Sequence, residues 1–209
     1  MAFDGSSAEP TAVVVLASAS PRRRALLELA GIPHRVEPSR VDEDRLAAAD
    51  PAAFTRRAAR HKARAVAERS PAGSWVLGAD TSVVLDERLL GKPRDVAHGR
   101  RMLQQLSGRD HEVLTAVCLQ RAGDGRPAEL LARTRVSFRT LAPDWIEGYL
   151  ASGEPMDKAG AYGIQGLGAL LVRAIDGSYT NVVGLPLGET VDLLVEREIW
   201  RPFGGGGQA

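Results

Sequence analysis

Short apolar runs alternate with helical segments along this chain, and a chain of this pattern is expected to fold as an α/β protein. Val13–Leu16 is a run of apolar, mostly β-branched residues, typical of a buried strand. Ser20 and Pro21 follow it and supply the cap and first-turn proline of a helix that Gly31 closes. The predicted strands span residues 13–16, 75–85, 111–120, 129–138 and 169–175; the predicted helices span residues 22–30, 50–69 and 143–150, one lies between Asp95 and Gly108, and one starts near Pro186.

One turn adds information about the sheet. Gly123–Gly125 (GDG) separates the strands predicted for residues 111–120 and 129–138 and is a β-hairpin signal. The other strands are interleaved with helices, so the expected fold is α/β with a mixed twisted sheet and flanking helices. Gly78, inside the strand predicted for residues 75–85, indicates a β-bulge. The pattern leaves the strand order open.

The two ends of the chain differ in composition from the rest. Residues 1–10 are largely polar and residues 204–209 (GGGGQA) are rich in glycine, and both segments are expected to be disordered. Residues 11–203 contain no linker and no repeat, and are expected to form a single domain.

Charge and cysteine content exclude several classes of partner and site. The chain has 27 Lys and Arg against 26 Asp and Glu, and a net charge of +1 gives no field to hold nucleic acid or an anionic membrane. Cys118 is the single cysteine, so a disulfide within the chain and a cysteine zinc cluster are ruled out. No apolar run has the length of a membrane span, and Asp4 precedes the first apolar run without a basic region. The chain is therefore expected to be cytoplasmic.

Lysine is scarce in this chain. Only Lys62, Lys92 and Lys158 are lysines, whereas 24 basic residues are arginines, and Asn181 is the single asparagine. If a coding bias removes lysine and asparagine wherever it can, these residues mark places where a compact ammonium or a small amide is hard to replace.

Several common catalytic motifs are absent from the sequence. Gly91 and Lys92 are followed by Pro93 and lack the upstream glycine of a phosphate-binding P-loop. The glycines of residues 160–168 lack dinucleotide-binding spacing, and there is no G-x-S-x-G nucleophile elbow. The four histidines lack the spacing of metal ligands. A serine hydrolase and a zinc hydrolase are therefore not expected.

The turn after the first strand is suited to bind an anion. It places Ser18, Ser20, Arg22 and Arg23 at the start of a helix, where unpaired amides and the helix dipole favour negative charge. Arginines at this end are electrostatically unfavourable unless a polyanion neutralises them. The alternative is a solvated arginine face in an arginine-rich protein.

Asp80 lies in the middle of the apolar strand predicted for residues 75–85. A carboxylate there loses hydration unless a cation or hydrogen-bond donors meet it. It is either an ion-paired structural residue, or a metal ligand or general base at the mouth of the sheet. Glu43 is a candidate second carboxylate, although an acidic loop is usually only solvated. Together with the cationic turn, these carboxylates suggest metal-assisted attack on a nucleotide phosphate.

Eight segments in order resemble the Maf family of nucleoside triphosphate pyrophosphatases, over about residues 13–199. They are Ser18–Arg23 (SASPRR), Val41–Glu43 (VDE), Gly78–Thr81 (GADT), Gly91–Pro93 (GKP), Ser107–His111 (SGRDH), Asp157–Gly160 (DKAG), Gly163–Gly166 (GIQG) and Asn181–Pro186 (NVVGLP). The resemblance implies a cytoplasmic Maf/ITPase-like enzyme with two lobes around a central cleft, often a homodimer. It also implies hydrolysis of a nucleoside triphosphate to the monophosphate and pyrophosphate.

The resemblance also implies roles for individual residues. Asp80 matches the family's proton acceptor, and Glu43 and Asp80 would hold one divalent cation, Mg²⁺ or Mn²⁺. Arg23, Lys62 and Lys92 would neutralise charge on the leaving pyrophosphate, with Ser18 beside them in the phosphate-binding turn. Whether Asp80 is base, metal ligand or both stays open.

Arg22, Thr81 and Gln165 match the branch of the family that acts on dTTP and UTP, not the branch that acts on 7-methyl-GTP. The glutamine amide offers both a donor and an acceptor, which suits the carbonyls and the N3–H of uracil or thymine. Gln165 could instead only fix a glycine-rich loop. The alternatives are a 7-methyl-GTP-type pyrophosphatase, activity on modified pyrimidine nucleotides, and a non-enzymatic nucleotide-binding regulator of septum formation. A house-cleaning role in the nucleotide pool, with a link to cell-division arrest, is also implied.

Overall fold

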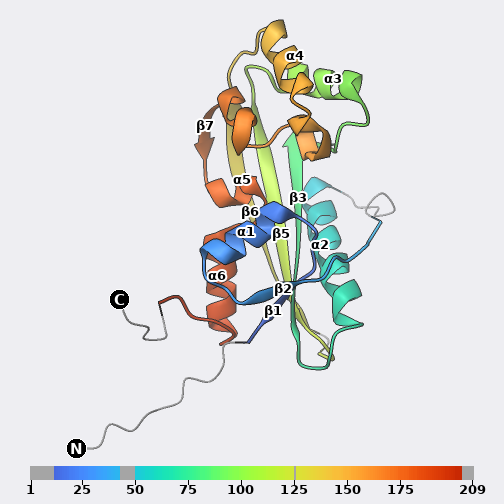
Figure 1. Cartoon of the computed structure of the whole chain (residues 1–209), viewed down its shortest axis with the longest axis vertical. Helices are drawn as coiled ribbons and strands as arrows, with labels where there is room; N and C mark the ends of the chain where they lie inside the picture. The colour runs from blue at the N-terminus through green and yellow to red at the C-terminus, as the bar shows by residue number, and fades with distance from the viewer. Residues whose placement is uncertain (1–11, 43–49, 125, 204–209) are drawn as a thin grey trace, which may run out of the picture.

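The computed structural model describes residues 12–42, 50–124 and 126–203 (Figure 1). Outside these ranges lie the two terminal segments predicted to be disordered, residues 1–10 and 204–209, and the candidate metal ligand Glu43. The strands are β1 (Val14–Leu16), β2 (His34–Val36), β3 (Trp75–Leu85), β4 (Arg88–Leu90), β5 (Asp110–Arg121), β6 (Ala128–Phe138) and β7 (Val172–Asp176). The α-helices are α1 (Pro21–Leu29), α2 (Pro51–Ala67), α3 (Val96–Leu106), α4 (Pro143–Ala151), α5 (Tyr179–Val183) and α6 (Leu187–Glu196), and the 3₁₀ turns are η2 (Glu154–Asp157), η3 (Ala159–Ala161) and η4 (Gly166–Leu171).

The predicted mixed sheet with flanking helices is confirmed. Seven strands form one sheet in the order β2-β1-β3-β5-β6-β7, and β4 also pairs with β3. The β1 strand is parallel to β2 and β3, whereas in the series β3, β5, β6 and β7 each strand runs antiparallel to the next. The hairpin predicted around Gly123 joins β5 to β6.

Among the strands and α-helices, three short ones were not predicted, namely β2, β4 and α5. The two strands have three residues each and largely exposed side chains, so they lack the apolar run that marks a buried strand. The strand predicted for residues 169–175 begins later, at Val172, because residues 166–171 form η4 instead.

The edge of β3 changes partner along its length, and this opens the sheet in the middle. Parallel β1 pairs with Val76 and Leu77, whereas antiparallel β4 pairs with residues 83–85. Between them, residues 78–82 have no strand partner on that edge among the described residues. Ligands of open α/β sheets bind in such gaps at the ends of strands, where the partner switches. Asp80 lies in the centre of this gap.

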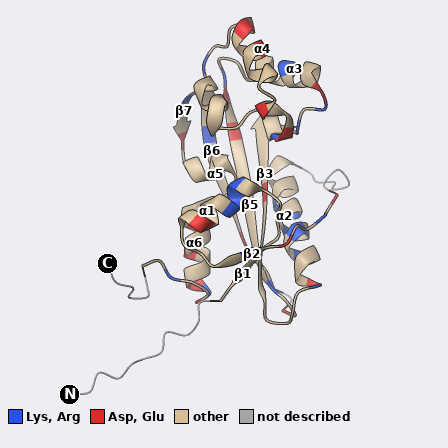
Figure 2. Cartoon of the chain, viewed as in Figure 1, with Lys and Arg blue, Asp and Glu red and all other residues tan. Residues whose placement is uncertain are grey.

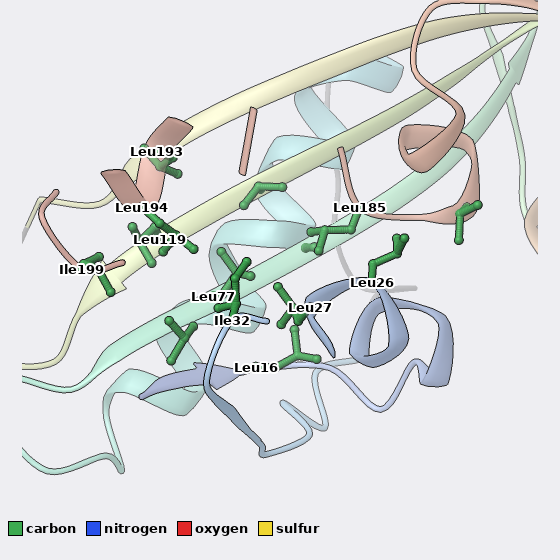
Figure 3. Packing of buried hydrophobic residues seen from close by; sticks show 14 of the residues in the cluster. Leu16, Leu26, Leu27, Ile32, Leu77, Leu119, Leu185, Leu193, Leu194 and Ile199 are labelled. Carbon is green, nitrogen blue, oxygen red and sulfur yellow. The ribbon is translucent and has the colours of Figure 1, made fainter. Parts of the chain in front are cut away.

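The two faces of the sheet are covered differently. Figure 3 shows the buried cluster on one face, which includes Leu26 and Leu27 of α1, Leu77 and Leu119 of the long strands, and Leu193 and Leu194 of α6. On the opposite face, small residues of α2 pack against β1, β3 and β5. At the other end of the long strands, α3, α4 and η3 enclose a separate cluster around Phe138 (Figure 1). The molecule is therefore elongated, with a core at each end of the sheet and the gap in β3 between them.

The β-bulge predicted at Gly78 is wrong. Pairing of β3 with β5 continues through Gly78 opposite Cys118 without a shift of register. The glycine is required by α2 instead: a Cβ at residue 78 would collide with the carbonyl oxygen of Ala59 and lie 2.6 Å from the amide nitrogen of Ala63. This close approach brings Lys62, which directly precedes Ala63 in α2, against β3 beside Asp80.

No helix among the described residues is long and apolar enough to cross a membrane.

Candidate active site

A cleft of about 590 Å³ lies at the gap in β3, between the two ends of the molecule. One wall comes from residues 17–23 and 38–41, and the other from Lys92 and residues 157–159 and 162–165. Every described residue that the sequence nominated for the site lines this cleft: Ser18, Arg22, Arg23, Lys62, Asp80, Thr81, Lys92 and Gln165. These eight residues, which come from segments far apart along the chain, therefore converge on one cavity.

Lys62 and Asp80 form a buried ion pair at this cleft. The Lys62 ammonium donates a hydrogen bond of 2.6 Å to Oδ1 of Asp80, and their side chains are only 9% and 6% exposed. The cation that the buried carboxylate was expected to require is thus a lysine from α2. A buried carboxylate held by one cation at the wall of a cleft is suited to accept a proton from a neighbouring water.

The turn before α1 is built as an anion-binding helix start. The Ser20 hydroxyl accepts the Arg23 amide at the N-cap of α1, and Pro21 occupies the first turn. The side chain of Arg23 is buried and donates hydrogen bonds from Nε to the carbonyl of Gly184, from Nη1 to Oγ of Ser18 and from Nη2 to Oγ1 of Thr81. Arg23 therefore ties α1, β3 and the end of α5 together beneath the cleft.

The residues matched to base selection lie on opposite walls. Gln165 precedes η4 and is exposed to the cleft, whereas Arg22 projects from the first turn of α1. Arg22 forms an ion pair across the cleft with Asp157 of η2, with 3.5 Å between Nη1 and Oδ2. Burial tends to raise the pKa of Asp157, but the hydrogen bond from Lys158 and the nearby charges lower it below the ordinary value.

The cleft is predominantly cationic. Arg22, Arg23, Arg40, Lys62, Lys92 and Lys158 line it, against the carboxylates of Asp80 and Asp157 alone among its described lining residues. In Figure 2 the ribbon of α1 is coloured for basic residues where it crosses the middle of the long strands. Such a concentration of positive charge in a concave site attracts a polyanion such as a triphosphate.

Histidine is absent from the described lining of the cleft. The nearest buried one, His111 on β5, bonds through Nε2 to the hydroxyl of Tyr162, which does line the cleft. Burial lowers the pKa of His111 to about 4, so its ring is neutral at physiological pH. Among the described residues, the groups that could act as a base in the cleft are therefore its two carboxylates.

Sequence reasoning missed how α5 is fixed, although it singled out Asn181 as the one asparagine. The Asn181 amide is fully buried and donates to the carbonyl of Val113 and to Oγ1 of Thr134, on β5 and β6. This anchors α5, which ends at Gly184, whose carbonyl accepts Nε of Arg23. The rarity of asparagine in the chain was the available signal.

Known proteins resemble the chain over most of its length. The family model described as "Maf-like protein" matches residues 13–197. A dTTP/UTP pyrophosphatase of Moorella thermoacetica is 55% identical over 181 residues, covering 87% of this chain and 93% of that protein. The protein of the same name from Myxococcus xanthus is 53% identical over 183 residues, covering 87% of this chain and 91% of that protein.

One solved structure supports the fold independently of close sequence similarity. A HAM1 protein from Coxiella burnetii superposes with a TM-score of 0.51 at 15% identity, covering 88% of this chain and 99% of that chain. At this identity the likeness concerns the fold alone. The family match, by contrast, spans nearly all of the described residues and contains every cleft residue discussed here, so this chain belongs to the Maf family.

Proposed function

We propose that this protein hydrolyses dTTP and UTP to the nucleoside monophosphate and pyrophosphate. The observation that carries the proposal is the buried Lys62–Asp80 pair in a cationic cleft of nucleotide size. Membership of the Maf family supports the reaction, and the names of relatives more than 50% identical support the substrates. A role in keeping the cytoplasmic nucleotide pool clean follows from this activity.

In the proposed mechanism, Asp80 is the general base. Lys62 holds Oδ1, so Oδ2 takes the proton as the attacking water bonds to the α-phosphorus. The bond from that phosphorus to the bridging oxygen then breaks, and pyrophosphate leaves. Arg23, Lys62 and Lys92 stabilise the charge that develops on the leaving group. Asp157 is a poorer candidate for the base because its side chain is 67% exposed and already paired with Arg22 and Lys158.

A divalent cation fits the donor set of the cleft. Among the described residues, no group of three or more His, Cys, Asp and Glu side chains could enclose a metal ion. Mg²⁺ needs no such cage, because it is commonly held by one or two carboxylates together with substrate phosphates. Asp80, with Glu43 outside the described residues, would hold Mg²⁺ or Mn²⁺ on the phosphates. The ion would supply Lewis-acid stabilisation of phosphoryl charge.

We assign recognition of the nucleobase to Gln165, Arg22 and Thr81. Gln165 is exposed in the cleft, where its amide is available to pair with the carbonyl and N3–H groups of a pyrimidine. A 7-methylguanine carries positive charge and would be better matched by a carboxylate or an aromatic face. The cation-lined cleft thus favours the pyrimidine substrates over the 7-methyl-GTP alternative.

A nucleotide panel with pyrophosphate detection tests this function. With Mg²⁺ present, kcat/KM for dTTP and UTP should exceed that for ATP, GTP and 7-methyl-GTP by about tenfold or more, since a mismatched base leaves polar groups of the site unpaired. Gln165→Glu should reduce this preference, and EDTA should abolish turnover. Equal rates for purines and pyrimidines would contradict the substrate assignment. Tight nucleotide binding without any turnover would instead support the alternative, a non-enzymatic regulator.

A homodimer, which the family resemblance implies, stays a prediction. Light scattering of the purified chain would decide it, and a monomeric mass at micromolar concentration would contradict it.

A further inference from the structure

The loop that carries Gln165 is held by a carboxylate outside the cleft lining. Glu154, the first residue of η2, accepts the amide of Leu167 at Oε2 (2.9 Å) and the amide of Gly168 at Oε1 (3.0 Å). Its Oε1 also accepts the hydroxyl of Tyr149, with 2.9 Å between the oxygens. The two backbone amides are those of the second and third residues after Gln165, in the first turn of η4, so one carboxylate fixes the backbone on the C-terminal side of this glutamine.

Tyr149 fixes the other side of the same glutamine. Its hydroxyl oxygen accepts the amide of Gly163, two residues before Gln165, while its proton goes to Glu154. Tyr149 is 5% exposed and comes from α4, which packs in the core around Phe138. The loop is thus held on both sides of Gln165 by a tyrosine–glutamate unit rooted in a packed helix.

The close contacts of this loop with η2 and α4 explain its glycines. A Cβ at Gly166 would lie 2.7 Å from Oε2 of Glu154, and Gly166 has a φ of +69°. A Cβ at Gly168 would collide with the carbonyl oxygen of Gly163 and lie 2.6 Å from the Tyr149 hydroxyl. A Cβ at Gly163 would lie 2.7 Å from the side chain of Lys158. The glycine-rich composition therefore serves close contact with η2 and α4.

The charge of Glu154 suits this role. Burial tends to raise the pKa of Glu154, but the hydrogen bonds from Gly168, Leu167 and Tyr149 and the charge of Lys158 lower it below the ordinary value. Glu154 is therefore an acceptor at both oxygens at neutral pH. The third lysine of the chain belongs to the same turn: the Lys158 ammonium bonds to the carbonyl of Glu154 and to the carboxylate of Asp157.

We propose that Glu154 is a positioning residue for selection of the nucleobase. Through its hydrogen bonds to the loop, Glu154 holds Gln165 in the position where the Gln165 amide meets the pyrimidine. The inference rests on the proposed function, since it concerns selectivity at the same site. Glu154 acts without contacting the substrate. Its loss should affect discrimination between bases more than the chemical step, which depends on Asp80 and Lys62 at the edge of β3.

Glu154→Gln is the sharpest substitution for testing this role. If the NH₂ group of the new glutamine takes the place of Oε1, it faces the backbone N–H of Gly168. If it takes the place of Oε2, it faces the backbone N–H of Leu167. In either orientation two donors meet, so the loop must move while the size of the side chain is unchanged. We expect the ratio of kcat/KM for dTTP over GTP to fall roughly tenfold, mainly through KM for dTTP. Glu147→Gln is the matched control, because Glu147 is an exposed carboxylate of α4 paired with Arg100.

A double-variant cycle separates positioning from a merely structural role. If Glu154 acts through Gln165, adding Glu154→Gln to Gln165→Ala should leave the dTTP-to-GTP ratio of the single Gln165→Ala variant unchanged. Additive losses of selectivity would overturn the inference, and so would a uniform loss of activity on all nucleotides with an unchanged ratio. Should Glu154→Gln not fold, Tyr149→Phe decides, since it keeps the ring and removes only the hydroxyl; an unchanged ratio in that variant overturns the inference.

The nucleotide preference of the wild-type enzyme distinguishes failure of the proposed substrates from failure of the role of Glu154. A wild-type enzyme without a pyrimidine preference would overturn the proposed substrates and this inference with them. A selective wild type whose preference survives Glu154→Gln, or Tyr149→Phe where Glu154→Gln does not fold, would overturn the inference alone.

Discussion

Asp80→Asn is expected to lower kcat for dTTP by about 10²–10⁴-fold, the usual contribution of a positioned general base. The amide of asparagine cannot accept the proton of the attacking water. It still offers an oxygen to the Lys62 ammonium, which lies 2.6 Å from Oδ1 in the wild type, so the fold should persist. The measurement is steady-state turnover by pyrophosphate release, with circular dichroism to verify folding.

Asp86→Asn is the matched control for this substitution. Asp86 follows β3 directly and pairs with Arg109 on the surface, away from the cleft-lining residues. Its variant should turn over dTTP at the wild-type rate. Near-normal turnover of Asp80→Asn would remove Asp80 from the chemistry and leave the ion pair with a structural role only.

Lys62→Met is expected to reduce both stability and activity. It leaves the carboxylate of Asp80, whose side chain is 6% exposed, without its cation. Removing one partner of a buried ion pair commonly destabilises a protein by about 3–5 kcal/mol, because the remaining charge is buried and uncompensated. Turnover should fall as well, since the base is no longer oriented and a charge facing the phosphates is lost.

The double variant Lys62→Met/Asp80→Asn tests the coupling between these two residues. It removes the uncompensated charge, so urea unfolding should show recovery of part of the stability lost in Lys62→Met, without recovery of turnover. Strictly additive losses of unfolding free energy would contradict the coupling that the 2.6 Å contact indicates.

The elements that the sequence predicted well are those with local signals. Ser20, Asp50 and Asp95 each cap the helix expected after them, accepting a backbone amide three residues on. The long strands β3, β5 and β6 carry enough apolar residues to be recognised. The strands β2 and β4 have no such signal, because three exposed residues gain their structure only from pairing with a neighbour.

The residues that belong to the site could be predicted better than the contacts between them. The sequence nominated a set of site residues, and those of them that the structure describes line one cleft. The sequence could not show that Lys62 contacts Asp80, because that contact depends on the close approach of α2 to Gly78. The prediction of a β-bulge at this glycine was wrong. Nor could the sequence show that Asp157 reaches across the cleft to Arg22. These contacts join distant segments and depend on tertiary packing.

The position of the bond that is cleaved tests the central claim most directly. The purified protein should be incubated with dTTP and Mg²⁺, and the products separated by anion-exchange chromatography. The proposed attack at the α-phosphorus predicts dTMP and pyrophosphate in equal amounts, with no dTDP at any time. The appearance of dTDP and orthophosphate as the first products would contradict the account, because it would place the reacting phosphorus at the far end of the triphosphate.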